Sequence, residues 1–367
     1  MNKKIKNIVT VALASLIVFG FFIVCLIKPA TEYSDSERRY LDQFPELSIE
    51  TLLNGKFMTG FEDYTLDQFP LRDTFRSIKS FTAFYLMGQL DNNDIYVHDG
   101  YIAKLEYPMN TQSIQTAGDK FSSIYDKYFA GKDMNVYMTV VPDKNAYLHD
   151  EAGRLSMDYD KFVSLMKESA PNFEYIDIFP LLDYTDYYRT DTHWKQEEIF
   201  DVAQHIASTM GVTLDAEYEK VLATDDFKGV YMGQVSLPID SDEMYYMTND
   251  VLEGCTVING EIGEQMPMYV SDKLTDRDPY EMFLGGSLSL ITIENPNAET
   301  DRELIIFRDS FGSSIAPYFA EAYSKITVVD IRYIHSAMLG NFINYENQDV
   351  LFLYSTLVLN NSSTIKG

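Results

Sequence analysis

Four short, mainly apolar runs most constrain how this chain can fold. Apolar residues fill each run almost without interruption, as they do in parallel strands that are covered on both faces. The segments between the runs place apolar residues at helical spacing. Strands that alternate with helices predict an α/β fold, with a mainly parallel sheet and helices on both faces. The four runs are residues 136–141, 304–307, 326–331 and 350–354.

The same patterns predict the other elements of this region. Residues 95–104 read as a hairpin with Asp99-Gly100 at its turn. Residues 214–300 break the alternation and are rich in Gly, Asp, Met and Tyr, so we expect a β-rich insertion or lid there. Helices are expected at 111–129, 159–168, 194–210 and 315–323, with a further strand at 173–179.

The N-terminus carries a long apolar segment. Residues 8–27 contain no charged side chain, and Lys3, Lys4 and Lys6 precede them. Twenty residues suffice to span the ~30 Å hydrocarbon core, and lysines before the span favour a cytoplasmic N-terminus. The alternative, a cleaved signal peptide, normally has a shorter apolar region and a small-residue cleavage site. We therefore expect an uncleaved single-pass anchor, with the bulk of the chain extracellular.

This interpretation divides the chain into four parts. Residues 1–7 are the expected cytoplasmic N-terminus, 8–27 the anchor, 28–90 a helical stalk or cap, and 91–367 the main domain. The net charge of −27 becomes −31 without the four lysines of residues 1–28, since 25 basic and 56 acidic side chains remain. That balance argues against a nucleic-acid partner. Only Cys255 lies outside the first 28 residues, so we expect a disulfide-free bacterial surface protein.

Ser310 is the candidate nucleophile. It follows the predicted strand at 304–307 and precedes Phe311-Gly312, which leads into a helix. A serine at such a turn stands at the carboxyl edge of the sheet, where open α/β sheets bind ligands. The backbone N–H groups of Ser310 and Gly312 are the candidate oxyanion donors. The plain alternative is that Ser310 is only a turn residue.

Asp191-Thr192-His193-Trp194 supplies the candidate base. An aspartate two residues before a histidine can reach its Nδ1 and fix its tautomer. His193 would then take the proton of Ser310. The alternative is a structural pair or a pair of metal ligands, but no further His/Asp cluster at ligand spacing supports a metal, and no cofactor is expected.

Two loop cations are candidate substrate contacts. Lys144 follows the predicted strand that ends at Pro142, and Arg332 follows the predicted strand at 326–331. Both could face a sugar or a carboxylate at the same sheet edge as Ser310. Solvated loop cations are the alternative.

Several segments resemble one known family. Tyr188-Arg189-Thr190-Asp191-Thr192-His193-Trp194 and the downstream Arg308-Asp309-Ser310-Phe311-Gly312 resemble the SGNH-hydrolase-like alginate O-acetyltransferase superfamily, and its DHHW branch most of all. Thr192 stands where the DHHW motif has histidine.

The resemblance implies a flavodoxin-like SGNH core with a rearranged order of catalytic residues. Ser310 would be the nucleophile, His193 the general base and Asp191 its orienting acid. It also implies a membrane-anchored O-acetyltransferase or esterase with a polysaccharide acceptor and a multi-pass membrane acyl-transfer protein as donor. The alternatives are a polysaccharide- or wall-binding module with a degenerate triad, and a surface assembly factor with a protein partner.

Overall fold

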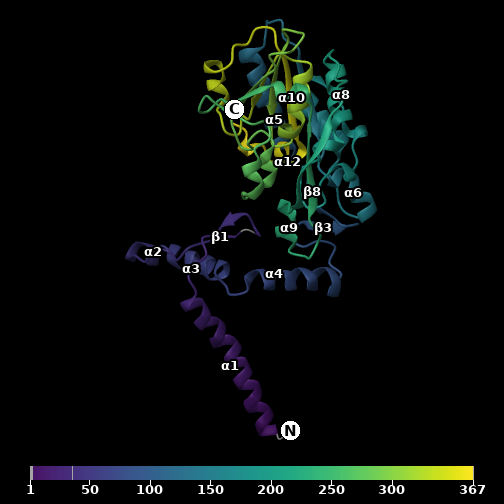
Figure 1. Ribbon diagram of the computed structural model, residues 1–367. Helices are drawn as coiled ribbons and strands as arrows, with labels where there is room; N and C mark the ends of the chain where they lie inside the picture. The colour runs from purple at the N-terminus through teal and green to yellow at the C-terminus, as the bar shows by residue number, and fades with distance from the viewer. Residues whose placement is uncertain (1–2, 35, 367) are drawn as a thin grey trace. The chain divides into compact units, whose positions relative to one another are not determined.

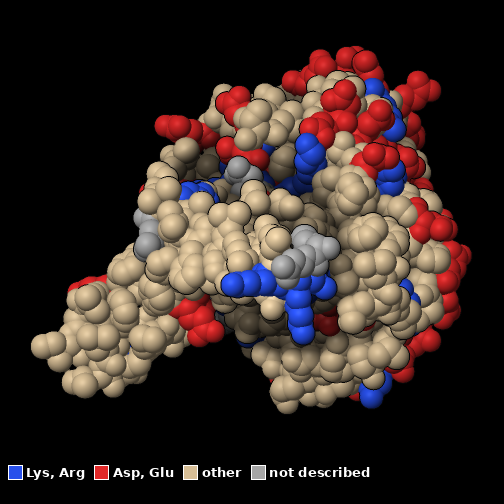
Figure 2. All heavy atoms as spheres, turned by 90° about the horizontal axis from the view of Figure 1, so that it is seen from below, with Lys and Arg blue, Asp and Glu red and all other residues tan. Residues whose placement is uncertain are grey.

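The computed structural model describes residues 3–34 and 36–366, without the side chain of Leu26, so Met1 and Asn2 of the expected cytoplasmic segment lie outside it. The chain forms two compact units (Figure 1). Unit 1 contains residues 1–92 and 232–238, and unit 2 contains residues 93–231 and 239–367. Acidic side chains outnumber basic ones on the face drawn in Figure 2, in keeping with the net charge.

Unit 2 is built on an eight-stranded sheet in the order β10-β9-β11-β13-β12-β14-β5-β6. The strands from β13 to β6 run parallel, while β11, β9 and β10 are antiparallel. The strands are β5 (Val136–Val141), β6 (Glu174–Tyr175), β9 (Thr256–Asn259), β10 (Glu264–Met266), β11 (Leu290–Glu294), β12 (Glu303–Arg308), β13 (Lys325–Val329) and β14 (Asp349–Ser355).

Helices cover both faces of the sheet. Alternate side chains of each strand point to opposite faces, so each strand packs against helices on both sides. Leu351 and Leu353 of β14 pack with α8 (Phe200–Thr209) and the 3-10 segment Ala316–Glu321. The neighbouring Phe352 packs on the other face with α5 (Thr111–Tyr128) and α7 (Tyr159–Ser169). The predicted α/β class with a mainly parallel sheet is confirmed.

Smaller elements complete unit 2. The predicted hairpin is confirmed as β3 (Ile95–His98) and β4 (Tyr101–Lys104), and β7 (Glu219–Phe227) pairs with β8 (Asp242–Thr248). The remaining helical pieces are α6 (Asn145–Ala152), α10 (Asp250–Gly254), α11 (Gly312–Ile315) and α12 (Thr356–Leu359), with 3-10 turns at Phe179–Leu181, Tyr184–Asp186, Gln196–Glu198, Ser271–Thr275, Pro279–Met282, Ser336–Asn341 and Ser362–Thr364. The short helix α9 (Val230–Val235) begins in unit 2, and its residues from Met232 on belong to unit 1.

Two expectations were wrong in detail. The helix expected at 194–210 begins only at Phe200, because residues 187–194 form a closed loop instead. The strand expected at 173–179 is reduced to Glu174–Tyr175. Residues 214–300 are rich in strands, as expected, and three of these strands, β9, β10 and β11, extend the main sheet.

Unit 1 is mainly helical. Its first helix, α1 (Lys3–Ile27), contains a 23-residue stretch, Lys3–Cys25, that is long and apolar enough to cross a membrane, and the most apolar 18 residues of this stretch have a mean hydropathy of 2.8. The short strands β1 (Tyr33–Ser34) and β2 (Arg39–Tyr40) pair, and α2 (Ile49–Leu53), α3 (Lys56–Asp67), α4 (Arg72–Phe81) and a π-helical turn (Thr82–Leu86) follow. Arg39 and Arg72 hold the carboxylates of Asp67 and Glu37, which fixes this arrangement.

Candidate active site

The turn after β12 carries Ser310. Asp309, which is fully buried, holds this turn with both carboxylate oxygens. One oxygen accepts from the N–H of Phe311 at 3.1 Å, and the other accepts from the N–H and the hydroxyl of Ser355 at 2.7 and 2.6 Å. Ser355 ends the neighbouring strand β14. The turn is therefore tied to the carboxyl edge of the sheet, where Ser310 is half-buried.

A tight loop carries Asp191 and His193. Tyr187 and Trp194 pair across its base as an antiparallel bridge, and the Tyr188 N–H donates to the His193 carbonyl at 3.0 Å. The indole N–H of Trp194 donates to Ser314 Oγ at 2.8 Å. Since Ser314 belongs to α11, which begins two residues after Ser310, the buried Trp194 anchors the loop against the serine turn.

The two segments bring Asp191, His193 and Ser310 together. His193 Nδ1 lies 2.6 Å from Asp191 Oδ1, and His193 Nε2 lies 2.7 Å from Ser310 Oγ. Both distances are those of hydrogen bonds. Next to an ionised Asp191, Nδ1 carries the proton and Nε2 is left to accept from the serine hydroxyl. This is the arrangement of a serine nucleophile, a base and an orienting acid.

Asp191 has a hydrogen bond on each oxygen besides its contact with the imidazole. Oδ1 also accepts from the His193 N–H at 3.1 Å, and Oδ2 accepts from the Val230 N–H at 2.7 Å. Gly229 allows this approach, because a Cβ there would lie 2.3 Å from the Thr190 carbonyl carbon. The Asp191 side chain is 2% exposed, so these donors compensate for its burial.

Tyr280 is a site residue that the sequence did not reveal. Its ring stacks on the His193 imidazole at a centroid distance of 3.8 Å and an angle of 5°, while Phe311 contacts the imidazole at 4.9 Å. The Tyr280 hydroxyl lies 2.8 Å from Ser314 Oγ. Burial raises the pKa of Tyr280 well above its ordinary value, so the hydroxyl stays neutral. Tyr280 lies in the 214–300 segment, where no motif or periodicity pointed to it.

The two predicted oxyanion donors differ in their surroundings. The Ser310 N–H has no acceptor among residues 3–34 and 36–366, so it is free to donate to a substrate oxygen. The Gly312 N–H instead donates to the Asp309 carbonyl at 3.1 Å. The prediction for Gly312 was therefore wrong. Glycine is needed there for packing, since a Cβ would lie 2.4 Å from the Arg308 side chain.

Lys144 does not face a solvent-exposed substrate edge, so the structure contradicts that expectation. The side chain is buried, and its ammonium donates to the carbonyls of Ile102, Tyr188 and Asp191 at 2.7, 2.6 and 2.8 Å. Burial lowers the pKa of Lys144 to about 7, although the charges of Asp191 and Asp242 oppose this shift. Lys144 braces the loop that carries Asp191 and His193.

Arg332 lies at the same edge of the sheet as Ser310, since β13 and β12 are parallel neighbours. Its guanidinium donates to both oxygens of Asp330, at 2.9 and 2.7 Å. Burial by itself would lower the pKa of Arg332, but these bonds and the charge of Asp330 outweigh burial and raise that pKa. The buried Arg308 also contacts Asp330, at 3.4 Å. Arg332 keeps a part-exposed side chain, so it can still meet a substrate.

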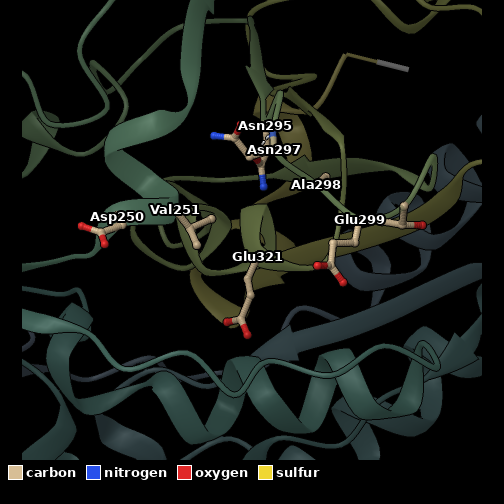
Figure 3. A pocket seen from close by; sticks show the side chains of 8 residues that line it. Asp250, Val251, Asn295, Asn297, Ala298, Glu299 and Glu321 are labelled. Atoms are coloured by element: carbon tan, nitrogen blue, oxygen red, sulfur yellow. Dashed lines mark hydrogen bonds between the residues drawn. The ribbon is translucent and has the colours of Figure 1, made fainter.

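Other polar groups lie away from this site. A cavity of about 460 Å³ is lined by Asp250, Asn295, Glu299 and Glu321 among others (Figure 3). Asn295 follows β11, whose last residue pairs with the first residue of β13, so this cavity is at the opposite edge of the sheet from Ser310. Among the described residues, the side chains with metal-ligand spacing are His98, Asp99 and Glu151, of which the two acids are exposed.

Comparison with known proteins shows a shared fold. No family model and no curated protein sequence matches the chain. A crystal structure of a DHHW family protein from Eubacterium siraeum is similar, with a TM-score of 0.57 and 21% identity over 75% of this chain and 95% of that chain. Bacillus cereus PatB1 is similar too, with a TM-score of 0.55 and 19% identity over 73% of this chain and 97% of that chain.

A second PatB1 structure, with a sulfonyl adduct, has a TM-score of 0.53 and 19% identity, over 72% of this chain and 97% of that chain. The predicted resemblance to the DHHW group is confirmed at the level of the fold.

Proposed function

We propose that the protein is a membrane-anchored serine O-acyltransferase or esterase that acts on acetyl esters of an extracellular polysaccharide. The observation that carries the proposal is the position of His193, hydrogen-bonded at once to Asp191 and to Ser310. The sequence resemblance to alginate O-acetyltransferases supports acetyl as the transferred group, and the sulfonyl adduct on PatB1 is in keeping with a nucleophile in a protein of this fold.

The first half-reaction forms an acyl-enzyme. Ser310 Oγ attacks the carbonyl carbon of the donor ester while His193 Nε2 takes the serine proton. The Ser310 N–H donates to the oxyanion, and Asp191 stabilises the imidazolium. The C–O bond of the ester then breaks, and His193 returns the proton to the departing alcohol. Ser310 is left acetylated.

The second half-reaction releases the acetyl group. His193 takes the proton of an incoming hydroxyl, whose oxygen attacks the acetyl carbonyl, and Ser310 leaves with that proton. A sugar hydroxyl gives transfer, and water gives hydrolysis. The proposed donor is a multi-pass membrane acyl-transfer protein, which suits a chain held at the membrane by residues 8–27.

The test is acylation of the full-length protein in detergent micelles by an aryl acetate. Intact mass and peptide mapping should find one acetyl group on Ser310. The adduct should be absent from Ser310→Ala and His193→Ala and unchanged in Ser287→Ala, an exposed serine that contacts Glu281 and no triad residue. Acetylated oligosaccharide rather than free acetate, after sugar is added, would identify a transferase. A folded protein without adduct or ester turnover would refute the proposal.

A further inference from the structure

Helix α4 and the turn after it have an inverted amphipathic pattern. The exposed side chains Leu71, Phe75, Ile78, Phe81 and Tyr85 recur at helical spacing and lie along one face. We call these five residues the apolar face. Surface helices of soluble proteins normally turn their apolar stripe toward the core. Here that stripe faces outward.

The opposite face of α4 is polar, yet it is this polar face that packs against the rest of unit 1. Arg72 pairs with Glu37 at 2.6 Å, and Arg76 pairs with the same carboxylate at 3.2 Å. Arg76 also donates to the Gly233 carbonyl at 2.6 Å, and the buried Ser80 accepts from Asn92. These specific contacts fix the rotation of α4, so its apolar side is held outward.

Other elements of unit 1 also expose large apolar side chains. Exposed apolar patches mark membrane or protein contacts. These side chains include Phe44 and Leu47, Ile49, Leu52 and Leu53 of α2, and Met58 and Leu66 of α3.

Contacts with α1 indicate how deep in a bilayer the apolar face of α4 would lie. The Phe21 ring stacks on Phe69 at 5.2 Å and contacts Phe75 at 5.7 Å. Phe21 lies four residues before Cys25, the end of the candidate span, which is about 6 Å along a helix. Interfacial helices bury their apolar face about 5–10 Å into the boundary between headgroups and acyl chains. Phe75 therefore lies at acyl-chain depth whenever α1 spans a membrane.

A cavity beside α1 favours lipid over protein as the occupant. It measures about 590 Å³ and is lined mainly by apolar side chains of α1 and α3, including Val18, Phe22, Phe61 and Tyr64. A flexible acyl chain can fill such a space. We propose that the apolar face of α4 lies in the outer leaflet of the bilayer, so that unit 1 is an interfacial platform as well as a link between the anchor and unit 2. This inference rests on the proposed membrane anchor but not on the acyl chemistry.

The test uses depth-dependent fluorescence quenching in the full-length chain. Cys25 and Cys255 are replaced by alanine, and one cysteine is introduced for an environment-sensitive dye. Ile78→Cys probes the apolar face, Ile17→Cys in α1 reports insertion of the anchor, and Asp126→Cys on α5 is the exposed control. Each protein is reconstituted in phosphatidylcholine–phosphatidylglycerol vesicles with or without nitroxide-labelled acyl chains.

The expected result is quenching of the dye at Ile78 by about twofold or more, as at Ile17, with no quenching at Asp126. Quenching at Ile17 without quenching at Ile78 would overturn the inference. A second comparison uses quenching by aqueous iodide. If iodide quenched the dye at position 78 in pure lipid vesicles but not in native membranes, a membrane protein rather than lipid would cover the apolar face, and the inference would be overturned. An unquenched Ile17 would overturn the anchor itself, and Ser310 acylation would be unaffected by any of these results.

Discussion

Replacing Asp191 by asparagine tests how the carboxylate controls His193. Both oxygens of Asp191 face N–H groups, so the amide of an asparagine must point its NH₂ at one of them. With the NH₂ in place of Oδ2, it would face the Val230 N–H at 2.7 Å. With the NH₂ in place of Oδ1, it would donate to His193 Nδ1 and face only the His193 N–H, at the longer distance of 3.1 Å. The second orientation has the weaker conflict, and we expect it to prevail.

That orientation reverses the histidine tautomer. Nδ1 becomes an acceptor, so Nε2 carries the proton and can no longer accept from Ser310. Loss of the base in this way costs about 10⁴-fold in turnover, or about 5.5 kcal/mol of transition-state stabilisation. One donor facing another in a buried site should also lower the free energy of unfolding by about 1–3 kcal/mol.

The assay is hydrolysis of an aryl acetate under single-turnover conditions, with stability measured by denaturant unfolding. Asp186→Asn is the matched control, because Asp186 lies just before the same loop and accepts from the Asp183 N–H without contacting His193. It should change turnover less than tenfold. If Asp191→Asn kept more than about a tenth of the wild-type rate, control of the tautomer by Asp191 would be refuted.

Substitutions at three further residues, Tyr280, Lys144 and Asp143, test other parts of the structure. Tyr280→Ala removes the ring stacked on His193 and should lower acylation about 10²-fold, whereas Tyr280→Phe keeps the ring and should lower it less than tenfold; equal losses would contradict a positioning role for the ring. Lys144→Met leaves three buried carbonyls without a donor and should lower the free energy of unfolding by about 3 kcal/mol in urea titrations; an unchanged midpoint would contradict the bracing role. Burial raises the pKa of Asp143 from 3.8 to about 6, so the folded state binds more protons than the unfolded chain in this window, and stability should fall by about 3 kcal/mol as pH rises through it. Asp143→Asn should reduce that fall in unfolding measured from pH 4 to pH 7, although a part should remain, because burial also raises the pKa of Asp186 to about 6. A fall that Asp143→Asn leaves unchanged would contradict the role of Asp143.

Local sequence was sufficient for much of the sheet. The runs that became β5, β12, β13 and β14 are apolar on both sides, since each strand is covered by helices on both faces. Such a run can be identified as a buried strand from its own residues, whichever strands it pairs with. The order of the strands and the antiparallel extension by β9, β10 and β11 depend on pairing between distant segments, and no local pattern in residues 214–300 encodes it.

The candidate site also depends partly on local sequence and partly on tertiary packing. Asp191, His193 and Ser310 could be named from sequence because each belongs to a short motif with an expected place at the sheet edge. Their hydrogen bonds, the stacking of Tyr280 and the donor from Val230 depend on how segments up to 117 residues apart pack together. Lys144 shows the limit most clearly. Its loop position predicted a substrate contact, whereas the fold surrounds its ammonium with backbone carbonyls. Residue type and local spacing determine which groups can do chemistry, and only tertiary packing decides which groups meet, because burial and partners are properties of the folded chain.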